Sequence, residues 1–516
     1  MPNAKQPQIF LTGNDIIPPT NVKRARTLVL CFDGTGDQFD NDNSNVVQLF
    51  SMLQKDDHTE QMVYYQAGIG TYTVPEIVTP IMSKVSQAMD EAVAWNLDAH
   101  VMDGYKFLME TYQNGDKICL FGFSRGAYTA RSLAGMIQKA GIMLSGTSLV
   151  KLTYGVQVGL LPAGNHQQVP FAYKMYTRAS AKGWKQSAAF KKAFSIDVDV
   201  EFVGVWDTVC SVGLVAKRLP FVSSNSAIRY FRHAVSLDER RAKFKANLYN
   251  RPTEEETKLG VQRGEMPKSG VSAKVGVTEV FQEWIDKTKN GAQREEQKQM
   301  QHEQEFSQSD ADSCETDTLE VWFAGCHCDV GGGSVPNDTP HNLARIPLRW
   351  MIRQCFLTNT GIRFHSSALK KIGIDPASLY PIVQTRPALS SFKPTHKRGV
   401  TDATLVDADI NEISDRTITE EDEDVKDALS PIYDQLAIKP AWWALEVLPL
   451  TQRYQRDDDT WVEKRIMNFG KGRVIPQQAL GFNVHRTVKI RMEAKDLKGG
   501  KYVPRARFTC EPTWVD

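Results

Sequence analysis

Ser124 lies between Gly122 and Gly126 in a Gly-Phe-Ser-Arg-Gly segment. The apolar run 117–121 comes directly before this segment, and a helix-like stretch, 127–140, follows it. A G-x-S-x-G sequence where a strand meets a helix is typical of a nucleophile elbow, a turn so sharp that side chains beside the serine must be nearly absent. We therefore predict that Ser124 is a nucleophile supported by its two glycines. The alternative is a buried structural turn.

A serine hydroxyl is a poor nucleophile near neutral pH, so it needs a base within hydrogen-bond reach, and that base needs a carboxylate to orient it. In α/β hydrolases these groups occur in the chain order serine, acid, histidine, each after a strand. Asp207 follows the apolar stretch 197–206, and His327 follows the stretch 319–323. We expect Ser124, Asp207 and His327 to form a catalytic triad. An alternative role for Asp207 is to cap the turn that follows it.

Two further histidines are candidates for a role at the site beside His327. His233 lies in a segment typical of a helix, where it would be a core or supporting residue. His485 precedes the strand-like stretch 487–492 and is the second candidate. His327 is preferred because a glycine run, 331–333, follows it and lets the backbone pack close to a ligand.

The run Cys326, His327, Cys328 and Asp329 could also bind a metal ion. A zinc site takes about four ligands in suitable pairs, and the chain has no Cys-x-x-Cys or His-x-His pair elsewhere to complete one. We therefore expect neither a metal ion nor a cofactor. Asp329 is assigned a supporting role at the site.

Ester hydrolysis also needs an oxyanion hole, usually two backbone N–H groups. The residue directly after the nucleophile, Arg125, is expected to supply one N–H group. The loop containing Gly34 and Thr35 is expected to supply the other, because its glycines let a substrate approach, and Asp33 is expected to orient it. The alternative is a tight turn that needs glycine for its backbone conformation alone.

Strands and helices alternate along the first two thirds of the chain. Apolar runs predict strands at 27–32, 61–66, 117–121, 197–206 and 319–323, and periodic apolar residues predict helices at 45–55, 89–112 and 127–140. This alternation predicts the α/β class and an α/β-hydrolase fold, with a mostly parallel, doubly wound sheet, helical and loop insertions and a C-terminal extension. Sites in such sheets lie at the carboxyl ends of the strands, where the candidate residues would meet.

The 516 residues divide into a polar leader, a catalytic domain and an extension. The leader is 1–26, and the α/β-hydrolase catalytic domain is 27–355. Within that domain, 251–318 is rich in Glu, Lys, Gln and Ser and is expected to be a solvated insertion, partly helical or disordered. The C-terminal extension, 356–516, is expected to pack on or next to the core.

Two segments of the extension have unusual composition. The acidic run Glu420 to Asp424 is expected to be an exposed loop. The stretch 442–450, which begins with two tryptophans, could be a lid or an amphipathic patch that faces lipid, but core packing is the commoner role of such a segment.

Composition limits the partners and the compartment. The net charge is +1, so nucleic acid is not an expected partner. Eight scattered cysteines suit free thiols in a reducing compartment. No signal-like apolar region follows the N-terminus, and no apolar run approaches the roughly 20 residues that a transmembrane helix needs. We expect a soluble, cytoplasmic protein.

Four blocks of the sequence, at 32–36, 122–131, 204–209 and 322–333, resemble the catalytic domain of the type VI secretion phospholipase effector family, which also contains many uncharacterised fungal α/β hydrolases. The resemblance runs from about residue 27 to residue 351, interrupted by the insertion. It implies an α/β-hydrolase fold, a Ser-Asp-His triad at the positions proposed above and, in the bacterial members, cleavage of phospholipid acyl esters.

The chain departs from this family pattern beside the histidine. Family members commonly carry a small or aliphatic residue and a serine where this chain has Cys326 and Cys328. That difference leaves the base in place and changes the packing around it.

The expected function is a serine hydrolase that cleaves carboxylic esters, lipid or phospholipid acyl esters in particular, through an acyl-enzyme. A hydrolase-like binding or scaffold protein with a vestigial site is one alternative. An acyltransferase or thioesterase that uses the same triad is another. The expected partners are a small-molecule or lipid ester substrate and, as an open alternative, a peripheral membrane contact.

Overall fold

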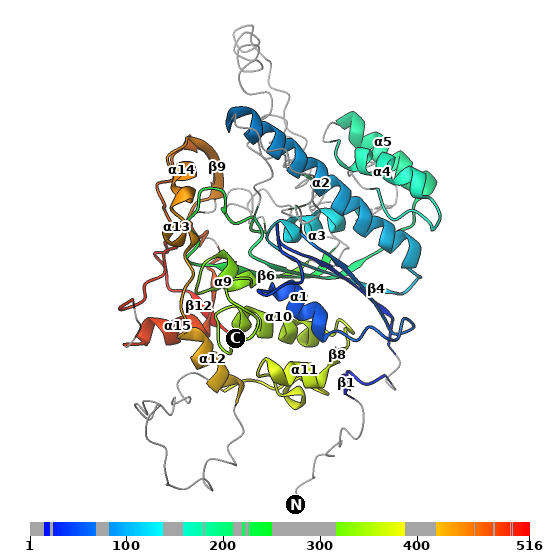
Figure 1. The fold of residues 1–516 in the computed structure, drawn as a ribbon. Coiled ribbons are helices and arrows are strands. Elements are labelled where there is room, and N and C mark those ends of the chain that lie inside the picture. Colours follow the sequence, from blue (N-terminus) through cyan, green and yellow to red (C-terminus); the bar gives the residue numbers. More distant parts are fainter. Residues whose placement is uncertain are drawn as a thin grey trace, which may run out of the picture.

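The computed structural model of the chain describes residues 15–20, 24–68, 82–137, 158–178, 181–209, 219–220, 222, 225, 228–249, 316–387, 419–458, 460–477, 480–495, 497 and 499–516. These residues form an α/β fold in which helices cover both faces of a central parallel sheet (Figure 1). The expected α/β class and parallel sheet are confirmed. Of the expected insertion at 251–318, only residues 316–318 lie among the described residues.

The central sheet has eight strands among the described residues, in the order β12-β11-β7-β6-β5-β4-β2-β3, and every neighbouring pair is parallel. Every residue of β2 is buried, as are nearly all residues of β4 and β5, which is the pattern of strands covered on both faces. The strands are β2 (Thr27–Phe32), β3 (Gln61–Gln66), β4 (Lys117–Phe123), β5 (Val200–Trp206), β6 (Ile228–Ser236), β7 (Asp317–Phe323), β11 (Asn483–His485) and β12 (Thr513–Val515).

The segment around His233 is a strand, β6, so the expected helix there is wrong. Residues 231–236 are buried without a break, and β6 pairs with β5 on one side and β7 on the other. Arg229, Arg232 and His233 interrupt the apolar residues of this short segment, so it lacks a periodicity that separates a buried strand from a buried helix. The neighbouring strands decide the conformation of this segment.

Side chains of each strand alternate between two apolar clusters. In β2, Leu28, Leu30 and Phe32 belong to one cluster, whereas Val29 and Cys31 belong to the other. The first cluster is covered by α2 (Met82–Thr111), α3 (Ser124–Ile137), α4 (Val169–Tyr176) and α5 (Ala181–Phe194) (Figure 1). The exposed turn η1 (His166–Gln168) leads into α4.

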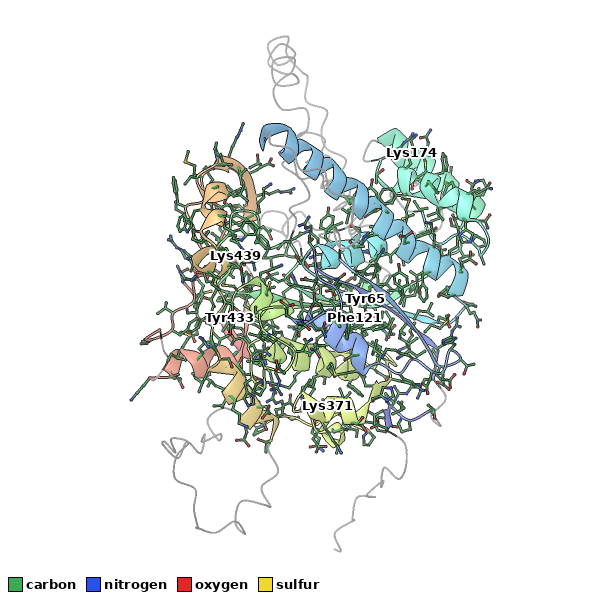
Figure 2. The ribbon with its side chains drawn as sticks, in the orientation of Figure 1. Tyr65, Phe121, Lys174, Lys371, Tyr433 and Lys439 are labelled. Atoms are coloured by element: carbon green, nitrogen blue, oxygen red, sulfur yellow. The ribbon has the colours of Figure 1, made fainter. Side chains whose placement is uncertain are left out.

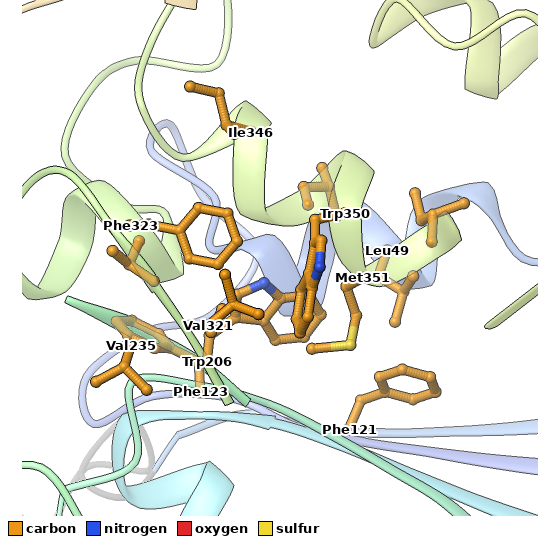
Figure 3. Close-up of a cluster of buried hydrophobic side chains, with 14 of the residues drawn as sticks. Leu49, Phe121, Phe123, Trp206, Val235, Val321, Phe323, Ile346, Trp350 and Met351 are labelled. Atoms are coloured by element: carbon orange, nitrogen blue, oxygen red, sulfur yellow. The ribbon is translucent and has the colours of Figure 1, made fainter. Parts of the chain in front are cut away.

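The opposite face of the sheet packs mainly against α10 (Arg345–Leu357) and α1 (Asn45–Met52). Trp350 and Met351 of α10 lie over Phe121 and Trp206 of the sheet (Figure 3). Further along this face follow β8 (Phe364–His365), α11 (Ser366–Lys371) and η2 (Pro376–Ser378). Part of the expected leader is also ordered, since β1 (Ile16–Ile17) pairs antiparallel with β8.

The C-terminal region extends the sheet through β11 and β12 and adds a lobe of short elements on the same side (Figure 1). The lobe consists of α13 (Gln435–Ile438), η4 (Pro440–Trp442), α14 (Trp443–Glu446) and the antiparallel hairpin of β9 (Leu450–Gln455) and β10 (Trp461–Ile466). The expected strand at 487–492 is wrong, because α15 (Arg486–Glu493) occupies it. His485 caps this helix by accepting the N–H of Thr487. The sequence did not reveal this capping role, because His485 ends a strand.

The acidic run that begins at Glu420 is a helix, α12 (Glu420–Ala428), and not an exposed loop. Glu420, Glu423 and Asp424 are buried. Their charges are balanced by Arg386 and by arginines of α10 such as Arg349, which lies 2.6 Å from Asp424. The sequence predicts a solvated run because the arginines that hydrogen-bond to these carboxylates lie 38 to 78 residues earlier in the chain.

None of the helices in the described residues combines the length and the apolar character needed to cross a bilayer.

Candidate active site

Ser124 is the first residue of α3 and follows β4 without an intervening loop. Its φ is +58°, a left-handed conformation that is strained for a residue with a side chain. A Cβ atom at Gly122 would lie 2.6 Å from the carbonyl oxygen of Gly126, and a Cβ atom at Gly126 would lie 2.3 Å from that of Phe32. Both glycines are therefore required by close backbone contacts around the serine.

Asp207 and His327 follow two other parallel strands and lie beside Ser124. Asp207 comes directly after β5, and His327 begins the short helix α9 (His327–Gly331) after β7. The Oγ atom of Ser124 is 2.8 Å from Nε2 of His327, and Nδ1 of His327 is 2.6 Å from Oδ2 of Asp207. The structure thus brings the three expected side chains into one hydrogen-bonded chain.

The protonation states follow from burial and from this hydrogen bonding. Burial lowers the pKa of His327 below its usual value, although the Asp207 carboxylate opposes the shift. Burial disfavours the charged form of Asp207, yet Arg473 and His327 together hold the pKa of Asp207 well below its usual range. A neutral imidazole with its Nδ1–H directed to a carboxylate leaves Nε2 free to accept the serine proton.

Arg473, which the sequence analysis missed, holds Asp207 from the other side. Its Nη1 and Nη2 atoms lie 2.5 and 2.9 Å from the two carboxylate oxygens of Asp207. It also donates to the carbonyl oxygens of Ser236 and Phe244, and it is almost wholly buried. No sequence signal marks this arginine, because it lies 266 residues after Asp207 in a segment without a motif.

His233 supports the turn that carries Asp207. Its Nε2 accepts the backbone N–H of Thr208 at 3.1 Å, and its Nδ1 lies 2.8 Å from Oε1 of Glu320. His233 is fully buried. This arrangement agrees with the supporting role weighed for His233 from the sequence, although its secondary structure was assigned wrongly.

Aromatic rings enclose the imidazole of His327. The ring centroids of Phe123 and Phe244 lie 4.6 and 4.9 Å from that of His327. The ring centroid of Trp442 in η4 lies 5.6 Å from that of Phe244. The lobe of the C-terminal region therefore contacts the site through the rings of Trp442 and Phe244. The backbone N–H of His327 donates to the buried carboxylate of Glu239 at 3.3 Å.

The loop expected to form part of the oxyanion hole is fixed by Asp33. Its Oδ1 accepts the N–H of Gly34 at 2.8 Å and the hydroxyl of Ser44 at 2.6 Å, while Oδ2 accepts the hydroxyl of Tyr65 at 2.7 Å. The Gly34 N–H is thus engaged within the loop. The buried hydroxyl of Thr35 has no hydrogen-bond partner among the described residues.

Asp329 holds the beginning of α9. Its Oδ2 accepts the N–H of Cys326 at 2.8 Å and that of Tyr433 at 3.0 Å, and burial raises its pKa to about 7. Burial also raises the pKa of Cys326 and Cys328, so both thiols are protonated at neutral pH. In the described part of the chain, no three His, Cys, Asp or Glu side chains are grouped as ligands for a metal ion.

His485, the second candidate for the base, lies away from the serine. Its ring stacks on Phe323 with centroids 4.9 Å apart, and its Nδ1 lies 2.8 Å from the hydroxyl of Thr487. Burial lowers its pKa to about 3. The structure gives this histidine a capping role.

The fold and the site define an α/β protein whose parallel sheet carries a hydrogen-bonded serine, histidine and aspartate at the carboxyl ends of its strands. The chain belongs to the family described as T6SS, phospholipase effector Tle1-like, catalytic domain, which matches residues 26–354. The resemblance stated from the sequence is confirmed. Membership of this family implies a lipid-hydrolysing enzyme.

A curated protein and two solved structures are similar to this chain. The uncharacterized protein YEL023C of Saccharomyces cerevisiae is 28% identical over an alignment of 576 positions, gaps included, that covers 93% of this chain and 81% of that protein. An uncharacterized protein from Pseudomonas aeruginosa is 17% identical with a TM-score of 0.32, covering 69% of this chain and 48% of that one. The Tle1 effector bound to the VgrG spike of the type 6 secretion system is 15% identical with a TM-score of 0.24, covering 62% and 53%. The chain thus spans about half the length of each solved structure.

Proposed function

We propose that the protein is a serine hydrolase with an α/β-hydrolase fold that cleaves carboxylic esters, and that its substrates are lipid or phospholipid acyl esters. The observation that carries this proposal is the hydrogen-bonded chain from Ser124 through His327 to Asp207, with distances of 2.8 and 2.6 Å. Family membership supports a lipid substrate.

Acylation begins when Nε2 of His327 takes the proton of Ser124 and the serine oxygen attacks the ester carbonyl carbon. The ionised Asp207 stabilises the resulting imidazolium. As the tetrahedral intermediate collapses, His327 returns the proton to the leaving alcohol and an acyl-enzyme remains. Water, deprotonated by His327 in turn, then attacks the acyl carbon and releases the carboxylic acid and the free serine.

The developing oxyanion needs donors close to Ser124. Arg125 is the second residue of α3, and N–H groups in the first turn of a helix have no partner within that helix. Thr35 contributes from the facing loop, where its hydroxyl has no partner among the described residues and Gly34 is engaged by Asp33. The rings of Phe123 and Phe244 form an apolar wall beside the base, which suits an acyl chain.

Replacement of the nucleophile tests this function. Ser124→Ala is expected to lower kcat by at least about a thousandfold, because the remaining groups cannot form the acyl-enzyme. The measurement is hydrolysis of p-nitrophenyl butyrate and of phosphatidylcholine by the wild-type and variant chains. Their melting temperatures serve as the control for folding.

Labelling with a fluorophosphonate probe provides a second readout. The wild-type chain should be labelled and Ser124→Ala should not. Equal hydrolysis by both chains, or a wild-type chain that does not react, would contradict the proposal and favour a binding protein with a vestigial site. Product analysis with an added alcohol distinguishes hydrolysis from acyl transfer.

A further inference from the structure

Exposed apolar side chains gather on the lobe of the C-terminal region. Seven large apolar residues in or directly after its elements are 37–54% exposed: Ile438, Trp443, Val447, Leu448, Ile466, Met467 and Phe469. A contiguous apolar surface of this kind on a folded protein usually marks a site that contacts a membrane or another molecule.

These side chains belong to one surface although they come from two stretches of the chain. The backbone N–H groups of Asn468 and Phe469 donate to the carbonyl oxygen of Glu446 at 3.1 Å, and Leu450 pairs with Ile466 in the hairpin. A Cβ atom at Gly470 would lie 3.2 Å from the ring of Trp443. We call the exposed residues of 437–449 and 464–472 the apolar–basic patch.

The charges of the patch have one sign. Its exposed charged residues are Lys439, Lys464, Arg465 and Lys471, whereas Glu446, its one carboxylate, is 1% exposed. Glu446 is turned inward and accepts the N–H groups of Ala242 and Gly470. Glu463 of β10 is exposed at the edge of the patch, opposite Arg453, whereas Asp457 and Asp458 lie at the other end of the hairpin, about 17 Å away at the rise of a β-strand.

A cavity of about 230 Å³ lies beside the patch and is bordered by Ile466, Met467 and Lys471. Its wall also contains Lys245 and Arg507, and none of the described residues that line it carries a carboxylate. Burial and the charge of Arg473 lower the pKa of Lys245 to about 8, so its ammonium group is partly desolvated. A cavity of this composition favours a negatively charged head group over a neutral one.

The patch is also connected to the active site. Trp442 precedes Trp443, its ring lies 5.6 Å from that of Phe244, and Phe244 lies 4.9 Å from His327. A surface that rests on the patch would therefore lie close to the ring that contacts the catalytic base. This is the position in which an enzyme could take a lipid ester directly from a bilayer.

We propose that the apolar–basic patch docks the protein on membranes that contain anionic lipids. The role of this docking in the uptake of a lipid ester rests on the proposed function. Its test measures binding to vesicles and does not depend on that function. The apolar side chains enter the interface between head groups and acyl chains, and the four cations attract the anionic surface. The occupant is a lipid bilayer, because the four exposed cations around the apolar residues outnumber the exposed acid at their edge, Glu463.

The test is flotation of the full-length chain carrying Ser124→Ala, which leaves the vesicles intact, with vesicles of phosphatidylcholine alone or mixed with phosphatidylserine. The chain should float with the mixed vesicles and much less with the neutral ones. Phe469→Asp should lower the partitioning at least about tenfold, since one buried phenylalanine is lost and one negative charge is added. Lys439→Glu combined with Lys471→Glu should abolish the preference for phosphatidylserine.

Phe194→Asp is the matched control, because Phe194 is 53% exposed and Phe469 is 54% exposed. Phe194 ends α5, and the neighbouring helix α4, which carries Lys174, lies on the side of the molecule opposite Lys439 (Figure 2). This variant should float like the unmodified chain. Equal flotation of Phe469→Asp and Phe194→Asp, or no flotation of the unmodified chain, would overturn the proposal.

Two further measurements distinguish membrane docking from dimerisation through the patch and from the proposed hydrolase function. A dimer in sedimentation analysis that Phe469→Asp dissociates would assign the patch to a second copy of the chain and overturn membrane docking. Hydrolysis of a soluble ester by the wild-type chain is measured in parallel. A chain that hydrolyses but does not float contradicts docking alone, and one that floats but does not hydrolyse contradicts the proposed function alone.

Discussion

Backbone strain is concentrated at the proposed catalytic residues. Among the described residues, four that are not glycine have positive φ, and two of these are Ser124 at +58° and Asp207 at +39°. Such conformations cost about 1–3 kcal/mol each and persist only where the surrounding structure enforces them. Here glycine contacts enforce the first, and bonds from Arg473 and from the N–H of Ser236 hold the side chain of the second.

Arg473 should act as a positioning residue for Asp207. Arg473→Gln removes the charge that faces the Asp207 carboxylate, so we expect kcat/KM to fall about one to two orders of magnitude as the imidazole loses its fixed orientation. In the wild-type chain, burial lowers the pKa of His327, and the acidic limb of kcat/KM should lie below about pH 6.5. Removing a nearby positive charge favours the imidazolium, so this limb should move to higher pH in the variant.

The measurement is a pH profile of soluble-ester hydrolysis, with Arg456→Gln, at an exposed arginine of the hairpin, as the control. A merely structural role for Arg473 would lower activity without moving the limb. Arg473→Lys should keep part of the kcat/KM that Arg473→Gln loses, because lysine retains the charge but not the two parallel hydrogen bonds.

The sequence signals for individual residues differ in strength. Ser124 has a local motif, and Asp207 and His327 each follow a recognisable apolar strand, so all three could be placed from sequence. Arg473 could not, since its contact with Asp207 spans 266 residues and arginines carry no local pattern that marks burial. The engaged N–H group of Gly34 depends on the rotamer of Asp33, which sequence does not determine.

At the scale of elements, apolar runs located five strands of the sheet, β2, β3, β4, β5 and β7, because strands buried in a parallel sheet leave a clear signal. The errors occurred where a segment takes its conformation from distant partners. β6 is a strand because β5 and β7 flank it, and α12 is buried because arginines of α10 face it.

Asp424 should be important for the attachment of α12. It lies 2.6 Å from Arg349 of α10 and 2.7 Å from Arg386, and both charges hold its pKa well below the usual range. Asp424→Asn leaves two buried guanidinium groups with weaker partners, so we expect the free energy of unfolding to fall by about 3–5 kcal/mol.

Urea denaturation at neutral pH measures this change, and Glu493→Gln on the exposed side of α15 is the control. The contribution of Asp424 is present above the pKa of an unfolded aspartate, about 4, and is lost as the pH falls through its lower folded value. The difference between variant and wild type should therefore shrink in acid. An unchanged midpoint at neutral pH would contradict this role.

At the scale of the whole molecule, buried carboxyl groups near the site should make the free energy of unfolding fall as the pH rises, which is the direction opposite to the contribution of Asp424. Burial, with the charge of Asp33, raises the pKa of Asp37 to about 8. A raised carboxyl pKa contributes stability below about pH 4 that is lost as the pH rises through the folded value. Asp37→Asn stays neutral, so its melting temperature should exceed that of the wild type by about 2 °C or more at pH 9 and not at pH 5.

Calorimetry over this pH range checks the difference, with Asp338→Asn, at an exposed position, as the control. Parallel melting curves for Asp37→Asn and the wild type at every pH would show that the carboxyl group of Asp37 does not titrate in this range.

The position of Arg473 has a practical consequence for expression of the segment that matches the family. A fragment ending at residue 355 would keep Ser124, Asp207 and His327, yet it would leave Asp207 as a buried anion without its countercharge. The same cut would strip β11 from β7 and expose a bare strand edge, which invites self-association. The segment that carries the recognisable motifs is thus shorter than the smallest piece that should work.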